Sequence, residues 1–147
     1  CLTITGIYDF VIIVRDNGPG RRVSVNLNSA LTDWLAENLT SEDLILTPEY
    51  SINEVTMAGV MMYMGWPYYA WSAGYDTNYR AAQAVTIYTT SDSETLKSTV
   101  KQEKITYILF EEGSEFEQQV CQEETIAATY EKVYETQDGR IRIYKTN

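Results

Sequence analysis

The stretch DLILTP at residues 43–48 decides the fold class, because its apolar residues form a continuous run. A strand with one solvated face alternates between apolar and polar residues, whereas a short apolar run closed by a proline indicates a strand covered on both faces. A second run of this kind, ITYILF, occupies residues 105–110. Buried strands separated by helical segments indicate an α/β protein with a largely parallel sheet.

The segments on either side of this first run fit that interpretation. Upstream, VSVNL at residues 23–27 alternates and predicts another strand. Asn28 or Ser29 can cap the helix that follows, in which apolar residues recur at helical spacing at Leu31, Trp34, Leu35 and Leu39. Downstream, residues 51–64 combine a possible capping box with the apolar run VMMYM, so we expect a short helix and then a strand.

Three more helices are predicted from their start signals. Asp76 or Thr77 can cap a helix through Ala81, Ala82, Ala84, Val85 and Tyr88. Ser91 with Glu94 forms a capping box for a helix that turns Leu96 and Val100 inward. By the same pattern, Ser114 with Glu117 predicts a helix that carries Phe116, Val120 and Ile126.

The chain closes with a hairpin signal, because Asp138-Gly139 separates EKVYET from RIRIYK and Asp-Gly suits a type I′ turn. We therefore expect one α/β domain over residues 1–147, a three-layer-like sandwich with a largely parallel sheet and an antiparallel edge hairpin. It would be Rossmann-like without the nucleotide motif, since Leu27-Asn28-Ser29 stands where a glycine-rich loop would be needed.

Composition excludes several function classes. The formal net charge is −10 and the 11 basic residues do not cluster, so we expect no nucleic acid partner. Histidine is absent, which removes the usual general base and the commonest metal ligand. Cys1 and Cys121 are too few for a disulfide framework or a zinc site, and Cys121 is predicted to be a buried thiol. We predict no catalytic residue, no metal and no cofactor.

The N-terminal stretch LTITGIYDFVIIV, residues 2–14, is mostly apolar but shorter than the roughly 20 residues of a bilayer span. One interpretation is that the chain starts just after a transmembrane helix, with residues 1–22 as a membrane-proximal lead-in. The other is an ordinary first strand. The sequence favours neither.

Residues 64–80, MGWPYYAWSAGYDTNYR, are the candidate site. Aromatic faces can stack on sugar rings, while a carboxylate and a guanidinium can bind hydroxyl or phosphate groups. The candidate ligand-binding residues are Trp66, Tyr68, Tyr69, Trp71, Tyr75, Asp76 and Arg80. The alternative is a structural loop that buries its own rings. If it is a site, we expect Trp66 and Tyr75 to be anchored inward and the other rings to form a patch near Arg80.

Several landmarks in order resemble one family. They are TGIYDF, a helix with Trp34 before DLILTP, GWPYYAWSAGY, Arg80 before IYTTSD, ITYILF and IRIYK. Together they resemble the extracytoplasmic C-terminal domain of multi-pass membrane proteins similar to glycosyltransferases, the class related to lipid-phosphate-sugar mannosyltransferases. Some members have a histidine shortly after Gly-Trp-Pro, where this chain has Tyr68, Tyr69 and Ala70, so no role of that histidine carries over.

The resemblance implies a domain at the cell membrane, on the extracytoplasmic side, whose partner is the transmembrane region of its parent protein. It also implies that the catalytic acid lies elsewhere in such a protein and that the domain contributes to binding a glycan acceptor or a lipid-linked sugar. Two other interpretations stay open. One is a free-standing extracytoplasmic module that binds carbohydrate or peptide, and the other is a small hydrolase with paired carboxylates.

Overall fold

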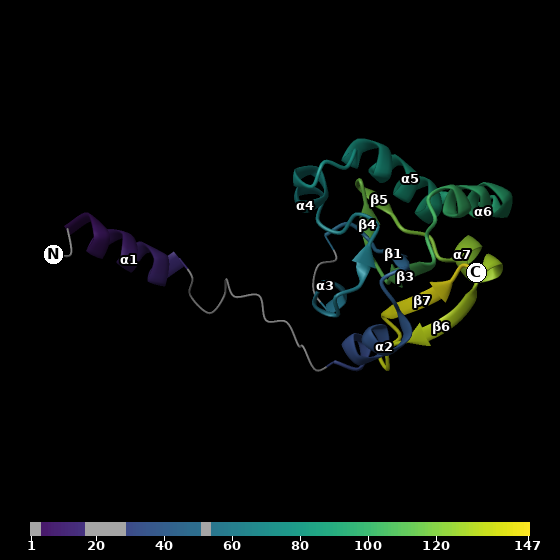
Figure 1. Cartoon of the computed structure of the whole chain (residues 1–147), viewed down its shortest axis with the longest axis horizontal. Coiled ribbons are helices and arrows are strands. Elements are labelled where there is room, and N and C mark those ends of the chain that lie inside the picture. The colour runs from purple at the N-terminus through teal and green to yellow at the C-terminus, as the bar shows by residue number, and fades with distance from the viewer. Residues whose placement is uncertain (1–3, 17–28, 51–53) are drawn as a thin grey trace.

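The computed structural model of the chain describes residues 4–16, 29–50 and 54–147 and is a mixed α/β structure. Residues Ile4–Asp16 form helix α1, so the interpretation of residues 2–14 as a first strand is wrong. The predicted strand at residues 23–27 lies outside the described residues, as does Cys1. In the rest of the described chain, a five-stranded sheet lies between two layers of helices (Figure 1).

The sheet has the strand order β2-β1-β3-β7-β6. Its strands are β1 (Leu44–Leu46), β2 (Met61–Met62), β3 (Tyr107–Glu111), β6 (Glu131–Glu135) and β7 (Ile141–Lys145). β1 pairs in parallel with β2 and β3, whereas β7 is antiparallel to both β3 and β6. The predicted strands at 43–47 and 105–110 and the closing edge hairpin are confirmed.

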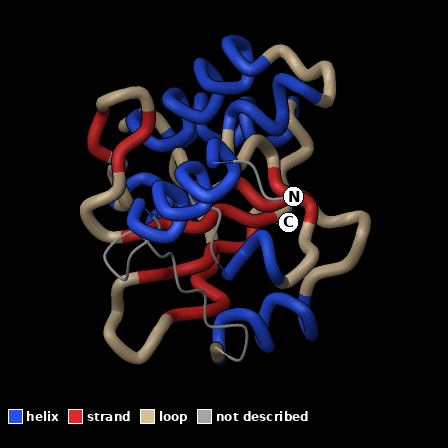
Figure 2. Tube along the Cα trace, turned by 90° about the vertical axis from the view of Figure 1, so that its left-hand side faces the viewer, coloured by secondary structure: helices blue, strands red, loops and turns tan. Residues whose placement is uncertain are grey.

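Helices cover both faces of this sheet, as the view in Figure 2 shows. One face packs against α2 (Ala30–Asn38) and α3 (Glu54–Met57). The other face packs against α4 (Pro67–Ser72), α5 (Thr77–Thr89), α6 (Ser93–Gln102) and α7 (Glu124–Thr129). The predicted three-layer sandwich is confirmed, and so is the short helix followed by a strand within residues 51–64.

Alternation along the buried strands divides the core into two halves. Ile45 and Leu109 pack on the α2 side, whereas Leu46 and Ile108 pack on the α5 side. Each of these four side chains is at most 1% exposed, which is why the strands read as continuous apolar runs. Cys121 is buried on the α5 side, as predicted.

The helix predicted at Ser114 is wrong, because this segment is the hairpin β4 (Glu115–Phe116) and β5 (Gln119–Val120). Glu117 and Gln118 turn the chain with φ angles of 46° and 62°. Phe116 is 1% exposed and stacks on Tyr88 of α5, with ring centroids 6.2 Å apart. Long-range burial of one ring therefore overrides the local capping pattern. Ile126 does lie on a helix, but on α7.

Two details of cap and turn chemistry also differ from prediction. Asp92, not Ser91, caps α6, since its carboxylate accepts from the backbone N–H groups of Glu94 and Thr95. The terminal hairpin is not a type I′ turn, which needs positive φ at both central residues. Gly139 has a φ of 71°, but Asp138 is not among the described residues with positive φ, and the turn is closed from Gly139 N–H to the Thr136 carbonyl at 2.8 Å.

Candidate functional site: an aromatic surface beside a strand-end hollow

The aromatic segment contains helix α4, which sequence reasoning treated as a loop. Pro67 begins the helix at a position where its missing N–H costs nothing. The helix ends in a Schellman arrangement, in which Gly74 N–H bonds to Trp71 O and Tyr75 N–H to Ala70 O. This ending requires a left-handed residue, and Gly74 has a φ of 88°. Of the helical residues, only Ala70 is buried, so α4 is fastened to the core by a small side chain.

Three large rings of α4 therefore lie on the outside. Tyr68, Tyr69 and Trp71 are 63%, 66% and 64% exposed. The centroid of Tyr68 is 6.1 Å from that of Tyr69 and 6.0 Å from that of Trp71, so the rings are contiguous. We call these three residues the aromatic surface. The alternative of a loop that buries its own rings is wrong, and an exposed apolar group of this kind typically marks an interaction site.

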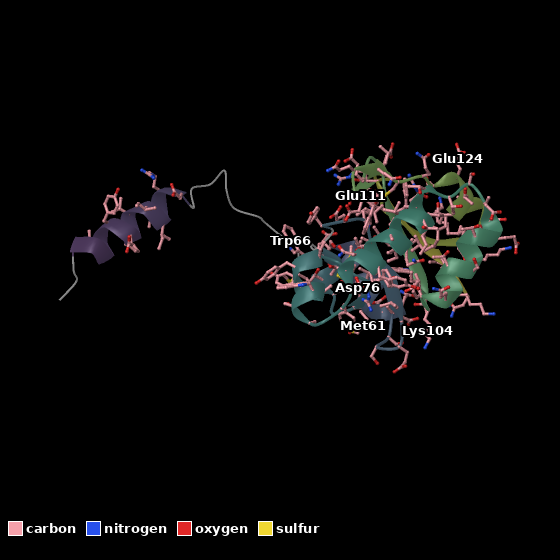
Figure 3. All side chains as sticks on the ribbon, turned by 90° about the horizontal axis from the view of Figure 1, so that it is seen from above. Met61, Trp66, Asp76, Lys104, Glu111 and Glu124 are labelled. Atoms are coloured by element: carbon pink, nitrogen blue, oxygen red, sulfur yellow. The ribbon has the colours of Figure 1, made fainter. Side chains whose placement is uncertain are left out.

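Trp66 and Tyr75, which were expected to be anchored inward, are also exposed, at 39% and 48%. Each is covered only in part. Trp66 meets Tyr50 edge-on at 4.8 Å between centroids, and Tyr75 lies beneath the guanidinium of Arg80 at 4.0 Å. Figure 3 shows Trp66 at the end of the sandwich where α4 projects. The expectation that both rings are anchored inward is therefore wrong.

Asp76 and Arg80, assigned to ligand binding from the sequence, both have structural roles. Asp76 caps α5 by accepting from Tyr79 N–H at 3.0 Å. Arg80 donates to the carbonyl oxygen of Tyr63, and its guanidinium lies 4.9 Å from the ring centroid of Tyr63 as well as over Tyr75. The guanidinium thus contacts two rings and one backbone carbonyl, which fixes its position beside Tyr63 and Tyr75.

A hydrogen-bonded network beneath Arg80 was not predicted. The hydroxyls of Tyr63 and Tyr79 donate to the two carboxylate oxygens of Glu103 at 2.8 Å and 2.7 Å. Partial burial alone would raise the pKa of Glu103, but these donors, with Gln102 and the charge of Arg80, hold that pKa below its usual range. For Tyr63, burial and the bond to Glu103 raise the pKa of the phenol. No local pattern signals this network, because Tyr63 and Glu103 are 40 positions apart.

A hollow of about 500 Å³ opens at the carboxyl ends of β1 and β3. It is lined by Glu49, Tyr50, Gly113, Glu115, Glu117 and Gln118. These residues come from the loop after β1 and from the segment after β3. We call this feature the strand-end hollow.

A hydrogen bond joins the two segments that line the hollow. The carboxylate of Glu49 accepts from the backbone N–H of Glu117 at 3.0 Å. The neighbouring Glu49 carboxylate, with the negative charge of Glu117, raises the pKa of Tyr50. The sequence analysis placed Glu117 in the capping box of a predicted helix and so missed the hollow. The sequence did contain one indication of the hollow, because the segments that line it directly follow the two predicted buried strands.

The hollow adjoins Trp66, at the start of the helix that carries the aromatic surface. Tyr50 lines the hollow and its ring contacts Trp66, the residue directly before the first turn of α4. Carboxylates that accept hydrogen bonds and rings that offer apolar faces thus occur side by side.

Within residues 4–16, 29–50 and 54–147, no group of three or more acidic or cysteine side chains is arranged to hold a metal ion.

No protein-family model matches the chain, and no curated protein shows significant similarity to it in sequence.

Proposed function

We propose that this chain is a non-catalytic extracytoplasmic domain of a membrane protein similar to glycosyltransferases and that it contributes to binding a glycan acceptor or a lipid-linked sugar. The observation that carries the proposal is the aromatic surface, three contiguous rings that the fold leaves in water. The class of parent protein and the extracytoplasmic side rest on the sequence resemblance.

Sugar binding suits this surface physically. One face of a pyranose ring presents C–H groups, which carry slight positive charge, and the face of an aromatic ring carries negative charge. Tyr68, Tyr69 and Trp71 offer such faces, while the phenol hydroxyls can bond to sugar hydroxyls. The rigid attachment of α4 through Ala70 and the Gly74 turn means that little order has to be gained on binding.

Helix α1 supports the membrane part of the proposal. Its exposed large apolar residues are Ile7, Tyr8, Phe10, Val11, Ile13 and Val14. At 100° per residue these positions span well over half of the helix circumference, an arc that also contains Arg15, and leave a stripe with Asp9 and Asp16. A face this wide is typical of helices in contact with lipid. None of the described helices is long and apolar enough to cross a bilayer.

A free-standing module that binds carbohydrate would use the same aromatic surface. The specific observation that favours the membrane-attached form is the apolar face of α1. Partition of the chain into lipid vesicles, tested below, separates the two.

The glycan proposal is tested by titrating the chain with neutral trisaccharides, namely maltotriose and mannotriose, and following backbone amides by NMR. We expect α4 amides to shift and Tyr69→Ala or Trp71→Ala to weaken binding by about threefold to tenfold, the equivalent of one aromatic contact. Because both rings are exposed, each change should cost less than about 1 kcal/mol of unfolding free energy.

The matched control is Tyr8→Ala, since Tyr8 is a tyrosine of equal exposure, 66%, outside the aromatic surface. It should leave trisaccharide binding unchanged. Loss of binding in the control as well, or unfolding of the domain by Trp71→Ala, would contradict the proposal.

A further inference from the structure

The strand-end hollow stands at the position where open α/β sheets place their ligands. β1 and β3 are parallel neighbours. The chain leaves β1 for α3 on one face of the sheet, and it leaves β3 for the β4–β5 hairpin, whose Phe116 packs against α5 on the other face. Connections that diverge to opposite faces leave a crevice between the two strand ends, which is the usual ligand position in such sheets.

The size and walls of the hollow suit a sugar ring. A volume of about 500 Å³ lies within the range of ligand sites, about 300–1,000 Å³. Tyr50 supplies an aromatic ring at the wall, and that ring continues to Trp66 and α4. Through Trp66 the hollow adjoins the start of α4, so a saccharide chain bound on the aromatic surface can extend toward this polar recess.

A buried hydroxyl stands at the same end of the sheet. Thr47 directly follows β1 and precedes Glu49 by two residues. Its side chain is 2% exposed, and Oγ1 has no hydrogen-bond partner among the described residues. A buried polar group without a partner is costly, but Thr47 is not among the residues that line the hollow, so it adds no ligand contact there.

The charges of the hollow decide which ligands it can take. Three of its six lining residues are glutamates and none is basic. Carboxylates accept hydrogen bonds from hydroxyl and ammonium groups, whereas phosphate and uronate groups would be repelled in a partly enclosed site. Arg80, the basic residue of the candidate segment 64–80, contacts the rings of Tyr63 and Tyr75 and does not line the hollow.

We infer that the strand-end hollow is a saccharide subsite that continues the aromatic surface, selects rings with hydroxyl or ammonium groups and excludes phosphorylated or carboxylated rings. This inference rests on the proposed function and narrows it, because it assigns the hollow to uncharged or amino-substituted glycan rather than to the phosphate of a lipid-linked sugar.

The experiment compares three trisaccharides of similar size at about 150 mM salt, where long-range charge effects are screened. Maltotriose is neutral, the chitosan trimer carries ammonium groups and trigalacturonate carries carboxylates. We expect the Gly113 and Gln118 amides to shift with the first two and to stay in place with the third, which should bind at least fivefold more weakly.

Two variants then test the residues. Glu49→Gln keeps an acceptor for Glu117 N–H but removes one negative charge from the hollow. Glu115→Gln removes the negative charge of a different lining residue. We expect each to bring the affinity for trigalacturonate to within about twofold of that for maltotriose. The control Glu37→Gln, on α2 and across the sheet, makes the same change in net charge and should have no effect.

The outcomes separate the two proposals. If maltotriose shifts α4 but leaves Gly113 and Gln118 in place, or if trigalacturonate binds as well as maltotriose, the subsite is overturned while the proposed function stands. If no trisaccharide binds in a way that depends on Tyr69, the proposed function fails and the subsite with it.

Discussion

Single residues of the aromatic segment take roles that their types alone do not reveal. Asp76 and Arg80 have ligand chemistry, yet one caps α5 and the other lies between two tyrosine rings. The rings at 68, 69 and 71 are more exposed than the other rings of the segment. The reason is the phase of α4, which turns Ala70 inward and so turns its large neighbours out.

Glu103 gives a test at the same scale, through the pH dependence of stability. Its pKa is held below the ordinary 4.5, so the folded state stabilises the charged form. The sign follows: this stabilisation is fully present above pH 4.5 and is lost as the pH falls through the lower folded-state value. We expect Glu103→Ala to lower the unfolding free energy by about 1 kcal/mol at pH 7, because the site is only partly shielded.

Urea unfolding of both proteins at pH 7 and near pH 3 measures this. The difference in unfolding free energy between wild type and variant should be smaller at the lower pH. Glu37→Ala, an exposed change on α2, serves as the control and should show little difference at either pH. A gap that stays constant on acidification would mean that the Glu103 charge is not involved.

At the scale of elements, the sequence predicts strands and helices well where the signal is local. The apolar runs predict the buried strands β1 and β3, and the residue types of Ser29 and Asp76 predict the helix caps. The β4–β5 hairpin does not, because its shape depends on Phe116 reaching Tyr88 across the fold. A local capping pattern cannot report a contact of that range.

The terminal hairpin is tied to α7 by a contact of the same long-range kind. The Glu123 carboxylate accepts from Arg142 at 2.5 Å and from the Tyr144 hydroxyl, and both side chains lie on β7. The Arg142 and Glu123 side chains are only 16% and 24% exposed. Glu123→Ala would leave two partly buried donors without their acceptor, so we expect a loss of about 1.5–3 kcal/mol.

Thermal unfolding measures this loss, with Glu124→Ala as the adjacent exposed control. If the ion pair between Arg142 and Glu123 attaches the hairpin to α7, the double variant Arg142→Met with Glu123→Ala should lose less unfolding free energy than the sum of the two single variants. Strict additivity would show that the two residues stabilise the fold independently.

For the whole molecule, the three-layer order follows from the sequence, but the candidate site follows only in part. The aromatic surface was visible as a dense run of rings. The strand-end hollow was not, because Glu49 and Glu117 lie 68 positions apart and meet only once β1 and β3 pair. Sites built by topology become visible once strand order is known.

Helix α1 provides the last test, because it decides between a membrane-attached protein and a free-standing module. A helix with an apolar face this wide should partition into neutral phosphatidylcholine vesicles, where the acidic protein surface meets no anionic lipid. Burial of a phenylalanine side chain contributes roughly 1.5–3 kcal/mol. Phe10→Asp should therefore reduce vesicle binding at least tenfold in a flotation assay, without lowering the thermal unfolding temperature, since Phe10 is 66% exposed.

Val120→Asp is the matched control, because Val120 of β5 is also an exposed apolar residue, at 54%, but lies outside α1. It should float with the vesicles as the wild type does. If the wild-type chain stays in the aqueous fraction and instead forms concentration-dependent oligomers that Phe10→Asp abolishes, then α1 pairs with a second copy of the chain. In that case the aromatic surface would belong to a free-standing glycan-binding module, since its exposure does not depend on α1.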